Sequence, residues 1–252
     1  MKHDPVLFDF ALALGDDALV LGHRLSEWSS HGPTLEEDIA LSNLGLDLIG
    51  QARLFYTYAG EVEGKGRTED DLAYFRDAAG YRNLLIVELE RGDFAFTIVR
   101  QFLYAAFVHP YFQALAKSTD VRLAEIAAKA VKEMAYHVRH SAEWLIRLAD
   151  GTDVSRRRAV QALDEIWGFT GEMFVMTGPE RALAAAGIAP DRAAIAPIWN
   201  ATVDKVLREA TLERPKDRGM QTGGRIGRHT EALDHMLAEM QVLARQHPGA
   251  TW

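Results

Sequence analysis

A carboxylate and an imidazole stand one helical turn apart in the segment KEMAYHVRH, residues 132–140, as Glu133 and His137. Residues four positions apart on a helix project from the same face. In di-iron carboxylate bundles, two helices each supply a glutamate, and the other two each supply a Glu-x-x-His pair. The segment could therefore form part of a di-iron site, provided that other helices supply the rest.

The segment NLGLDLIGQARLFY, residues 43–56, does not supply a second pair. Its possible Glu-x-x-His frames read Asp47 with Gly50, or Leu48 with Gln51. Neither frame contains a histidine, and only the first contains a carboxylate. This helix can offer at most one charged ligand.

Two further positions are also unsuited to iron. The strict Glu-x-x-His frame that ends at His137 has Met134 in the glutamate position, and the apolar stretch 94–116 contains no acid. The first helix contributes Asp16 and Asp17. Without an acid on every helix, the set of carboxylates that bridges two irons is incomplete.

The count predicts a remnant of a metal site and no catalytic residue in this chain. We expect Asp47, Glu133 and His137 to form a buried polar network in place of the metal, because buried polar groups in proteins are paired. The alternative is a metal-dependent oxygenase that uses these three residues as a degenerate site. If Asp17 converged with them, a single metal ion could bind.

The elements that position these residues are helices. Helical periodicity dominates, strand-like alternation is scarce, and no linker or internal repeat interrupts the chain. The sequence therefore predicts one all-α domain over residues 1–252, with a capping box at Thr34–Glu37 and a further cap at Thr68–Asp71. The predicted helices are 5–28, 34–61, 68–89, 94–116, 121–149, 155–176, 180–186, 191–213 and 229–246.

Composition excludes several classes of function. The 252 residues include no cysteine, which excludes disulfides, thiolate nucleophiles and iron–sulfur clusters. The net charge of −8 argues against nucleic acid as a partner. The chain begins without the apolar run of a signal peptide and contains no apolar run of membrane-spanning length, so we expect a soluble, cytoplasmic protein without a membrane partner.

A glycine-rich basic loop, QTGGRIGRH at 221–229, precedes the last predicted helix and carries Arg225 and Arg228. Glycines let backbone N–H groups approach an anion, and the N-terminus of a following helix adds partial positive charge. The loop could contact the phosphates of a ligand or an acidic patch on a partner. The alternative is a tight interhelical loop held by salt bridges.

A second candidate contact is the segment FRDAAGYRNLL, residues 75–85. It holds two of the residue types that anchor interfaces, and arginine pairs with phosphate or carboxylate. The alternative is an ordinary surface face with a buried tyrosine. The predicted substrate or partner contacts are Arg76, Tyr81, Arg82 and Asn83.

Three segments together resemble the C subunits of bacterial phenylacetyl-CoA epoxidases, which belong to a ring-oxygenating system of aerobic phenylacetate catabolism. The resemblance runs from about residue 10 to Trp252. It rests on GDDALVLGHRLSEWSSHGPTLEEDIALSNLGLDLIGQARLFYTYAGE (15–61), KEMAYHVRHSAEWLIRLADGTD (132–153) and TGGRIGRHTEALDHMLAEMQ (222–241).

The resemblance implies a ferritin-like helical bundle with additional C-terminal helices. It implies a non-catalytic structural subunit that pairs with a homologous A subunit, and the A subunit holds the di-iron centre and the pocket for phenylacetyl-CoA. Electrons come from a separate reductase, a further possible partner. On this reading the chain itself carries no cofactor, and the phosphates that the glycine-rich loop could contact are those of CoA. The apolar helices 34–61 and 94–116 are the candidates for core and interface, and a ferritin-like homo-oligomer of unrelated function stays open.

Overall fold

The computed structural model describes residues 4–217 and 219–250, and the regular elements in these ranges are all helical. The α-helices are α1 (Pro5–Ser26), α2 (Leu35–Glu63), α3 (Glu69–Tyr74), α4 (Leu85–Glu88), α5 (Phe94–Leu115), α6 (Val121–Asp150), α7 (Asp153–Trp167), α8 (Gly178–Ala185), α9 (Ala196–Glu209) and α10 (Glu231–Gln246). Short 3-10 turns occur at Ala78–Gly80, Gly171–Phe174, Arg192–Ile195 and Gly224–Ile226. The predicted all-α fold is confirmed.

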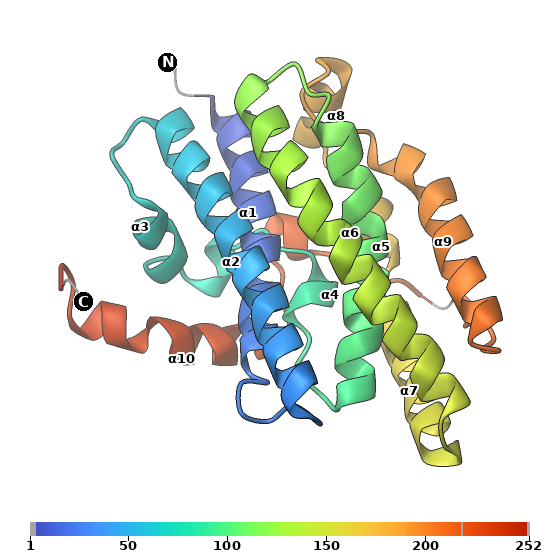
Figure 1. Ribbon diagram of the computed structural model, residues 1–252. Helices are drawn as coiled ribbons and strands as arrows, with labels where there is room; N and C mark the ends of the chain where they lie inside the picture. The colour runs from blue at the N-terminus through green and yellow to red at the C-terminus, as the bar shows by residue number, and fades with distance from the viewer. Residues whose placement is uncertain (1–3, 218, 251–252) are drawn as a thin grey trace.

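Four long helices, α1, α2, α5 and α6, form the bundle, as two antiparallel pairs (Figure 1). Helices α1 and α2 approach closely because glycines face each other: a Cβ on Gly22 would lie 3.2 Å from the carbonyl oxygen of Gly45. Helices α7 to α10 pack around this bundle, as expected for a ferritin-like fold with additional C-terminal helices. Among the described helices, none combines the length and apolar composition of a membrane span.

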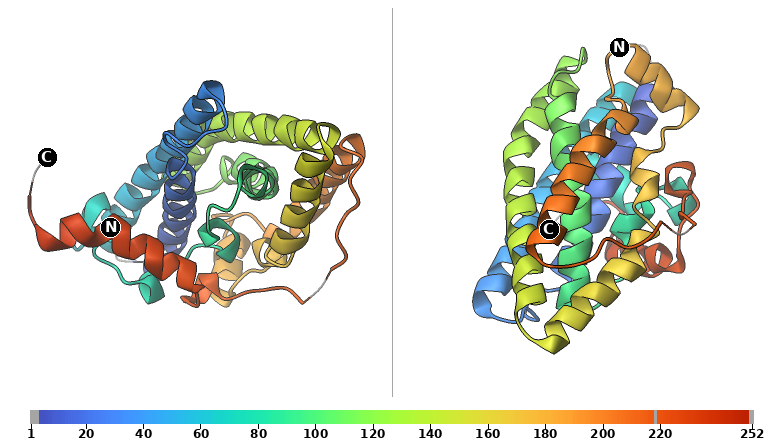
Figure 2. Two further views of the ribbon diagram at one scale, coloured as in Figure 1. Left: turned by 90° about the horizontal axis from the view of Figure 1, so that it is seen from below. Right: turned by 90° about the vertical axis from the view of Figure 1, so that its right-hand side faces the viewer.

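Helix α5 is the centre of the molecule, seen end-on in the left view of Figure 2 with other helices around it. Nearly all its side chains are buried, and Gln113 is the one exposed residue between Phe94 and Leu115. The enclosure explains why this stretch is apolar all round. It leaves no face for the interface predicted on 94–116, so that part of the expectation is wrong.

The helix predicted at 68–89 is also wrong. The chain forms α3 and then leaves the helical path, because the backbone N–H groups of Arg82 and Leu84 bond buried carboxylates on α1. Arg82 N donates to Asp16 Oδ2 at 2.7 Å, and Leu84 N donates to Asp17 Oδ1 at 2.7 Å. Helical periodicity cannot reveal such a distant competitor for backbone donors.

The two predicted caps differ in outcome. At Thr68 the side chain accepts from Asp71 N and the Asp71 carboxylate accepts from Thr68 N, a complete capping box. At Thr34 only the first half forms, with Glu37 N donating at 3.4 Å. The Glu37 carboxylate instead bonds His140 on α6, and this tertiary contact replaces the second half of the box.

Two predicted helices end early. The helix predicted at 155–176 overlaps α7, which begins at Asp153 and stops at Trp167 before a 3-10 turn. The helix predicted at 191–213 is a 3-10 turn followed by α9, which stops at Glu209. Apolar side chains continue past the ends of both helices, so the apolar pattern predicted helices that were too long.

Candidate functional site

The three predicted remnant residues lie together where α2 meets α6. His137 Nε2 lies 3.2 Å from Asp47 Oδ2, and Gln51 Nε2 donates to Glu133 Oε2 at 2.9 Å. His137 is fully buried, whereas the Asp47 side chain is 38% exposed. All three residues are hydrogen-bonded, but in two separate pairs, and Asp47 and Glu133 are only partly buried, so a single buried network of the three stays a prediction.

Helix α5 adds a residue that the sequence reasoning missed. Gln101, fully buried, places its Nε2 3.0 Å from His137 Nδ1. With the Asp47 carboxylate accepting, His137 donates from Nε2 and accepts from the Gln101 amide at Nδ1. An amide inside an apolar helix was the available signal, since a buried polar side chain requires a partner.

The donors in this network do not fit two irons. A di-iron bundle site uses four carboxylates and two histidines. Here two carboxylates and one histidine are already hydrogen-bonded, and neutral amides stand beside them on α2 and α5. Within the described ranges, no group of three or more His, Cys, Asp or Glu side chains is arranged to hold a metal ion. Asp17 does not join the network, since its carboxylate is bound by Arg225.

A second polar contact joins the same two helices. His140 Nε2 lies 2.9 Å from Glu37 Oε2, and both side chains are largely buried. Together with the Asp47–His137 and Gln51–Glu133 pairs, it makes three hydrogen-bonded pairs between α2 and α6. These pairs fix the relative position of the two helices.

The glycine-rich loop does bind an anion through its backbone, but the anion belongs to the chain itself. The N–H groups of Gly223 and Gly224 both donate to Glu172 Oε1 at 2.8 Å, and Leu85 N donates to Glu172 Oε2 at 2.8 Å. Glu172 is 3% exposed. The buried carboxylate thereby ties the loop to the start of α4.

Arg225 points inward from this loop. Its Nη2 lies 2.5 Å from Asp17 Oδ2, and its Nη1 donates to the carbonyl oxygens of Ala13 and Arg82 at 3.1 and 2.6 Å. Burial raises the pKa of Asp17, while the charge and hydrogen bonds of Arg225 oppose that rise. This geometry is that of a salt-bridged interhelical loop, the alternative that the sequence left open.

Arg76, which follows α3, binds the carboxylate one residue before Asp17 on α1. It forms a buried ion pair with Asp16, and Tyr56 Oη donates to the same carboxylate at 2.6 Å. The guanidinium also stacks on the ring of Tyr81, 4.1 Å from its centroid. Arg76 and Tyr81 are therefore structural links between α1, α2 and the segment after α3.

Asn83 is fully buried and donates from Nδ2 to Glu88 Oε2 at 2.8 Å. Glu88 also accepts from His229 Nδ1 at 2.7 Å and from Thr230 N at 2.6 Å. Burial lowers the pKa of His229, but the hydrogen bond and charge of Glu88 outweigh it, and the net pKa is raised. This cluster joins α4 to the start of α10.

Arg82 and Arg228 are the more accessible of the predicted contacts. Arg82 is partly exposed, and its Nη1 donates to the carbonyl oxygens of Ala79 and Tyr81. Arg228 is exposed, and its side chain has no ion-pair partner in the part of the chain that the structure describes. The predicted contact with CoA or a partner stays a prediction for both.

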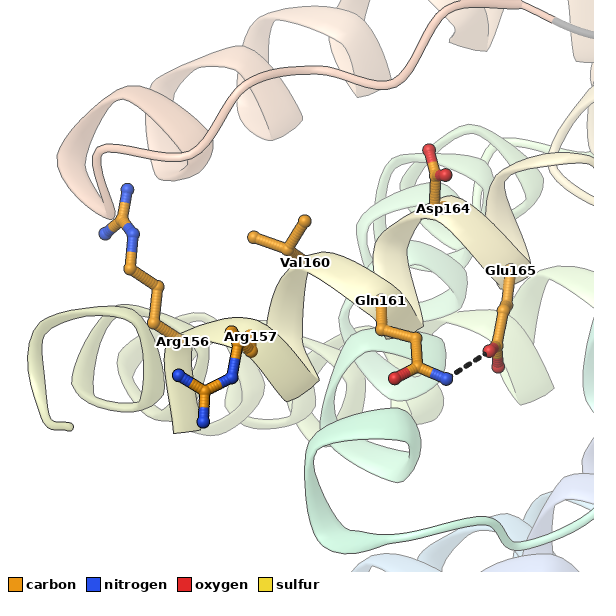
Figure 3. A pocket seen from close by; sticks show the side chains of 6 residues that line it. All are labelled: Arg156, Arg157, Val160, Gln161, Asp164 and Glu165. Carbon is orange, nitrogen blue, oxygen red and sulfur yellow. Dashed lines mark hydrogen bonds between the residues drawn. The ribbon is translucent and has the colours of Figure 1, made fainter. Parts of the chain in front are cut away.

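The cavities are small or open. One of about 180 Å³ lies between α1, α8 and the glycine-rich loop, with Phe10, Arg82 and Arg225 among its lining residues. Pockets for drug-sized ligands span roughly 300–1,000 Å³, so it is too small for an acyl-CoA. A wider depression on α7 is shallow: Figure 3 shows its side chains along a surface helix, with Gln161 Nε2 donating to Glu165 at 2.7 Å.

Comparison with known proteins identifies the family of the chain. The family model described as phenylacetic acid catabolic protein matches residues 1–252. The C subunit of the 1,2-phenylacetyl-CoA epoxidase of Escherichia coli (strain K12) is 48% identical over 243 residues, which cover 96% of this chain and 98% of that protein. The chain belongs to the phenylacetic acid catabolic protein family.

Proposed function

We propose that this chain is a structural, non-catalytic subunit of a multicomponent phenylacetyl-CoA epoxidase, where it pairs with and stabilises the di-iron A subunit. Its 48% identity to the C subunit of such an enzyme, over nearly the whole of both chains, supports membership of the complex. The match covers 96% of this chain and 98% of that protein, so the similarity is not limited to one segment.

One observation carries the non-catalytic role. Around His137, the positions that would complete a metal site are filled by the amides of Gln51 and Gln101 and by the thioether of Met134, which is fully buried. A neutral amide offers iron far less than a carboxylate, because hard cations prefer charged oxygen ligands. The bundle therefore stabilises this site with hydrogen bonds among its own side chains.

The test is the thermal stability of the mixed subunits. A partner that binds the folded chain raises its stability by about 2.7 kcal/mol at a concentration of 100 times Kd. For a protein of this size, that corresponds to a rise in Tm of roughly 5–11 °C. We expect both subunits to melt later when mixed, by scanning calorimetry; unchanged transitions at saturating concentration would refute the pairing.

The alternative, an oxygenase in its own right, requires Asp47, Glu133 and His137 to hold metal. It predicts that added Fe²⁺ raises the Tm of the isolated chain and that His137→Ala abolishes the rise. Our proposal predicts no such rise. Contacts with phenylacetyl-CoA or a reductase stay predictions, with Arg228 as the first residue to substitute.

A further inference from the structure

The outer faces of α2 and α6 carry exposed apolar side chains. On α2, Leu35, Ile39 and Leu46 are 73, 53 and 65% exposed, and on α6 Tyr136 is 40% exposed. Single exposed apolar residues are ordinary, but a group on two adjoining helices marks an interaction surface. We call these four residues the α2–α6 patch.

The four residues share one side of the molecule. Positions four and seven residues apart lie on one stripe of a helix, which aligns Leu35 with Ile39 and Ile39 with Leu46. The hydrogen bond between Asp47 and His137 places their sequence neighbours, Leu46 and Tyr136, at the same height. Figure 1 shows α2 and α6 side by side on the face toward the viewer, with no other helix in front of them.

The stripe continues to Gly50, where an added Cβ would meet nothing within 4 Å. A glycine on an exposed helix face allows a second backbone to approach closely. The α2 stripe therefore combines exposed apolar side chains with a glycine over which the backbone of a partner helix could pack.

The charge beside the patch is positive although the whole chain carries −8. Lys129, Lys132 and Arg139 are exposed on α6, and the structure shows no ion pair for any of them in the described ranges. Arg139 lies over the Tyr136 ring, 5.2 Å from its centroid. A partner that covers the patch must therefore bring carboxylates to its α6 side.

In a symmetric contact through this patch, a second copy would bring few free carboxylates, because Glu125 and Glu143 on α6 pair with Arg122 and Arg147. On α2, Glu37 and Asp47 are bonded to histidines of α6, and Asp38 accepts from Gly32 N. Glu36 is the one remaining acid on this part of α2, against three cations on α6. The charges favour a different protein with an acidic flank.

We propose that the α2–α6 patch and its three cations form the docking surface for a partner helix with an apolar stripe and an acidic flank. The proposal rests on the proposed function, because the A subunit is the partner to test. Apolar contact provides the affinity, and the cations provide orientation and a salt-dependent association rate.

The experiment measures the Kd between the purified chain and the A subunit, for variants whose circular dichroism matches the wild type. Ile39→Ser with Leu46→Ser, and Lys132→Glu with Arg139→Glu, should each weaken binding about 30-fold or more. The charge variant should also reduce the salt dependence of the association rate. Matched controls, which should bind like wild type, are Val242→Ser with Leu243→Ser on α10 and Lys205→Glu on α9, all at exposed positions.

The outcomes separate the two proposals. If wild type binds the A subunit and the patch variants bind equally well, the docking surface is refuted and the pairing stands. If wild type does not bind, the pairing itself fails, and the docking proposal fails with it. If the patch variants instead abolish a dimer of the isolated chain, the occupant is a second copy and our proposal is overturned.

Discussion

Replacing Arg225 by methionine separates a structural arginine from a ligand-binding one. The substitution removes the guanidinium that holds Asp17, a side chain 3% exposed, and leaves a buried carboxylate with Leu84 N as its remaining donor. Removing one partner of a buried ion pair costs about 3–5 kcal/mol. We therefore expect Arg225→Met to lower Tm by about 6–20 °C.

Urea and thermal unfolding, followed by circular dichroism, measure this loss. The matched control is Arg228→Met, three residues along the same loop, whose exposed side chain predicts a change within about 0.5 kcal/mol. Adding Asp17→Asn to Arg225→Met should recover much of the loss, because it removes the unpaired charge and keeps an acceptor for Leu84 N.

The same variant has a defined pH dependence. Without Arg225, burial raises the pKa of Asp17 further above its value in the unfolded chain. The folded variant therefore takes up a proton at a higher pH than the unfolded chain does, and its stability deficit shrinks as pH falls from neutral toward the ordinary range of a carboxyl pKa. If Arg225→Met unfolded like wild type and lost affinity for CoA, the internal-pair account of this loop would be refuted.

Two further predictions concern the segments that meet the glycine-rich loop. The pKa of His229 is raised by Glu88 above its ordinary 6.5, so the stability that this side chain contributes is complete below that pH and is lost as pH rises through the folded pKa. In urea titrations, His229→Gln should therefore show its largest stability deficit below pH 6.5 and a smaller one at pH 9. An equal deficit at both pH values would contradict this. In Gly224→Ala, the new Cβ would lie 2.0 Å from the Asn83 carbonyl oxygen, so we expect a loss of about 1–3 kcal/mol, whereas the control Gly219→Ala meets nothing within 4 Å and should unfold like wild type.

The long helices, and the presence of polar side chains between α2 and α6, were predictable because they depend on local pattern. Apolar periodicity fixed the ranges of α2, α5 and α6, and the spacing of Glu133 and His137 placed both on the core-facing side of α6. Asp47 followed from its chemistry, since a buried imidazole requires a polar partner. Gln101 was missed because an amide was not among the ligand types considered.

The contacts of the two candidate segments were not predictable from pattern. Arg225 and Asp17 are 208 residues apart, and Glu172 is 51 residues before Gly223. Periodicity shows that a helix has a buried face but not which distant segment covers it. Arginines next to glycines fit an external anion and an internal carboxylate equally well, and only the packing of α1 against the loop distinguishes these alternatives.

The iron content of the chain, expressed alone in iron-replete medium and measured by inductively coupled plasma mass spectrometry, tests the central claim most directly. The account predicts no stoichiometric iron or other transition metal, because Asp47 is hydrogen-bonded to His137, while Glu133 and His137 are each hydrogen-bonded to an amide. A content of about two irons per chain, the loading of a carboxylate-bridged bundle site, would contradict the account and make this chain an oxygenase in its own right.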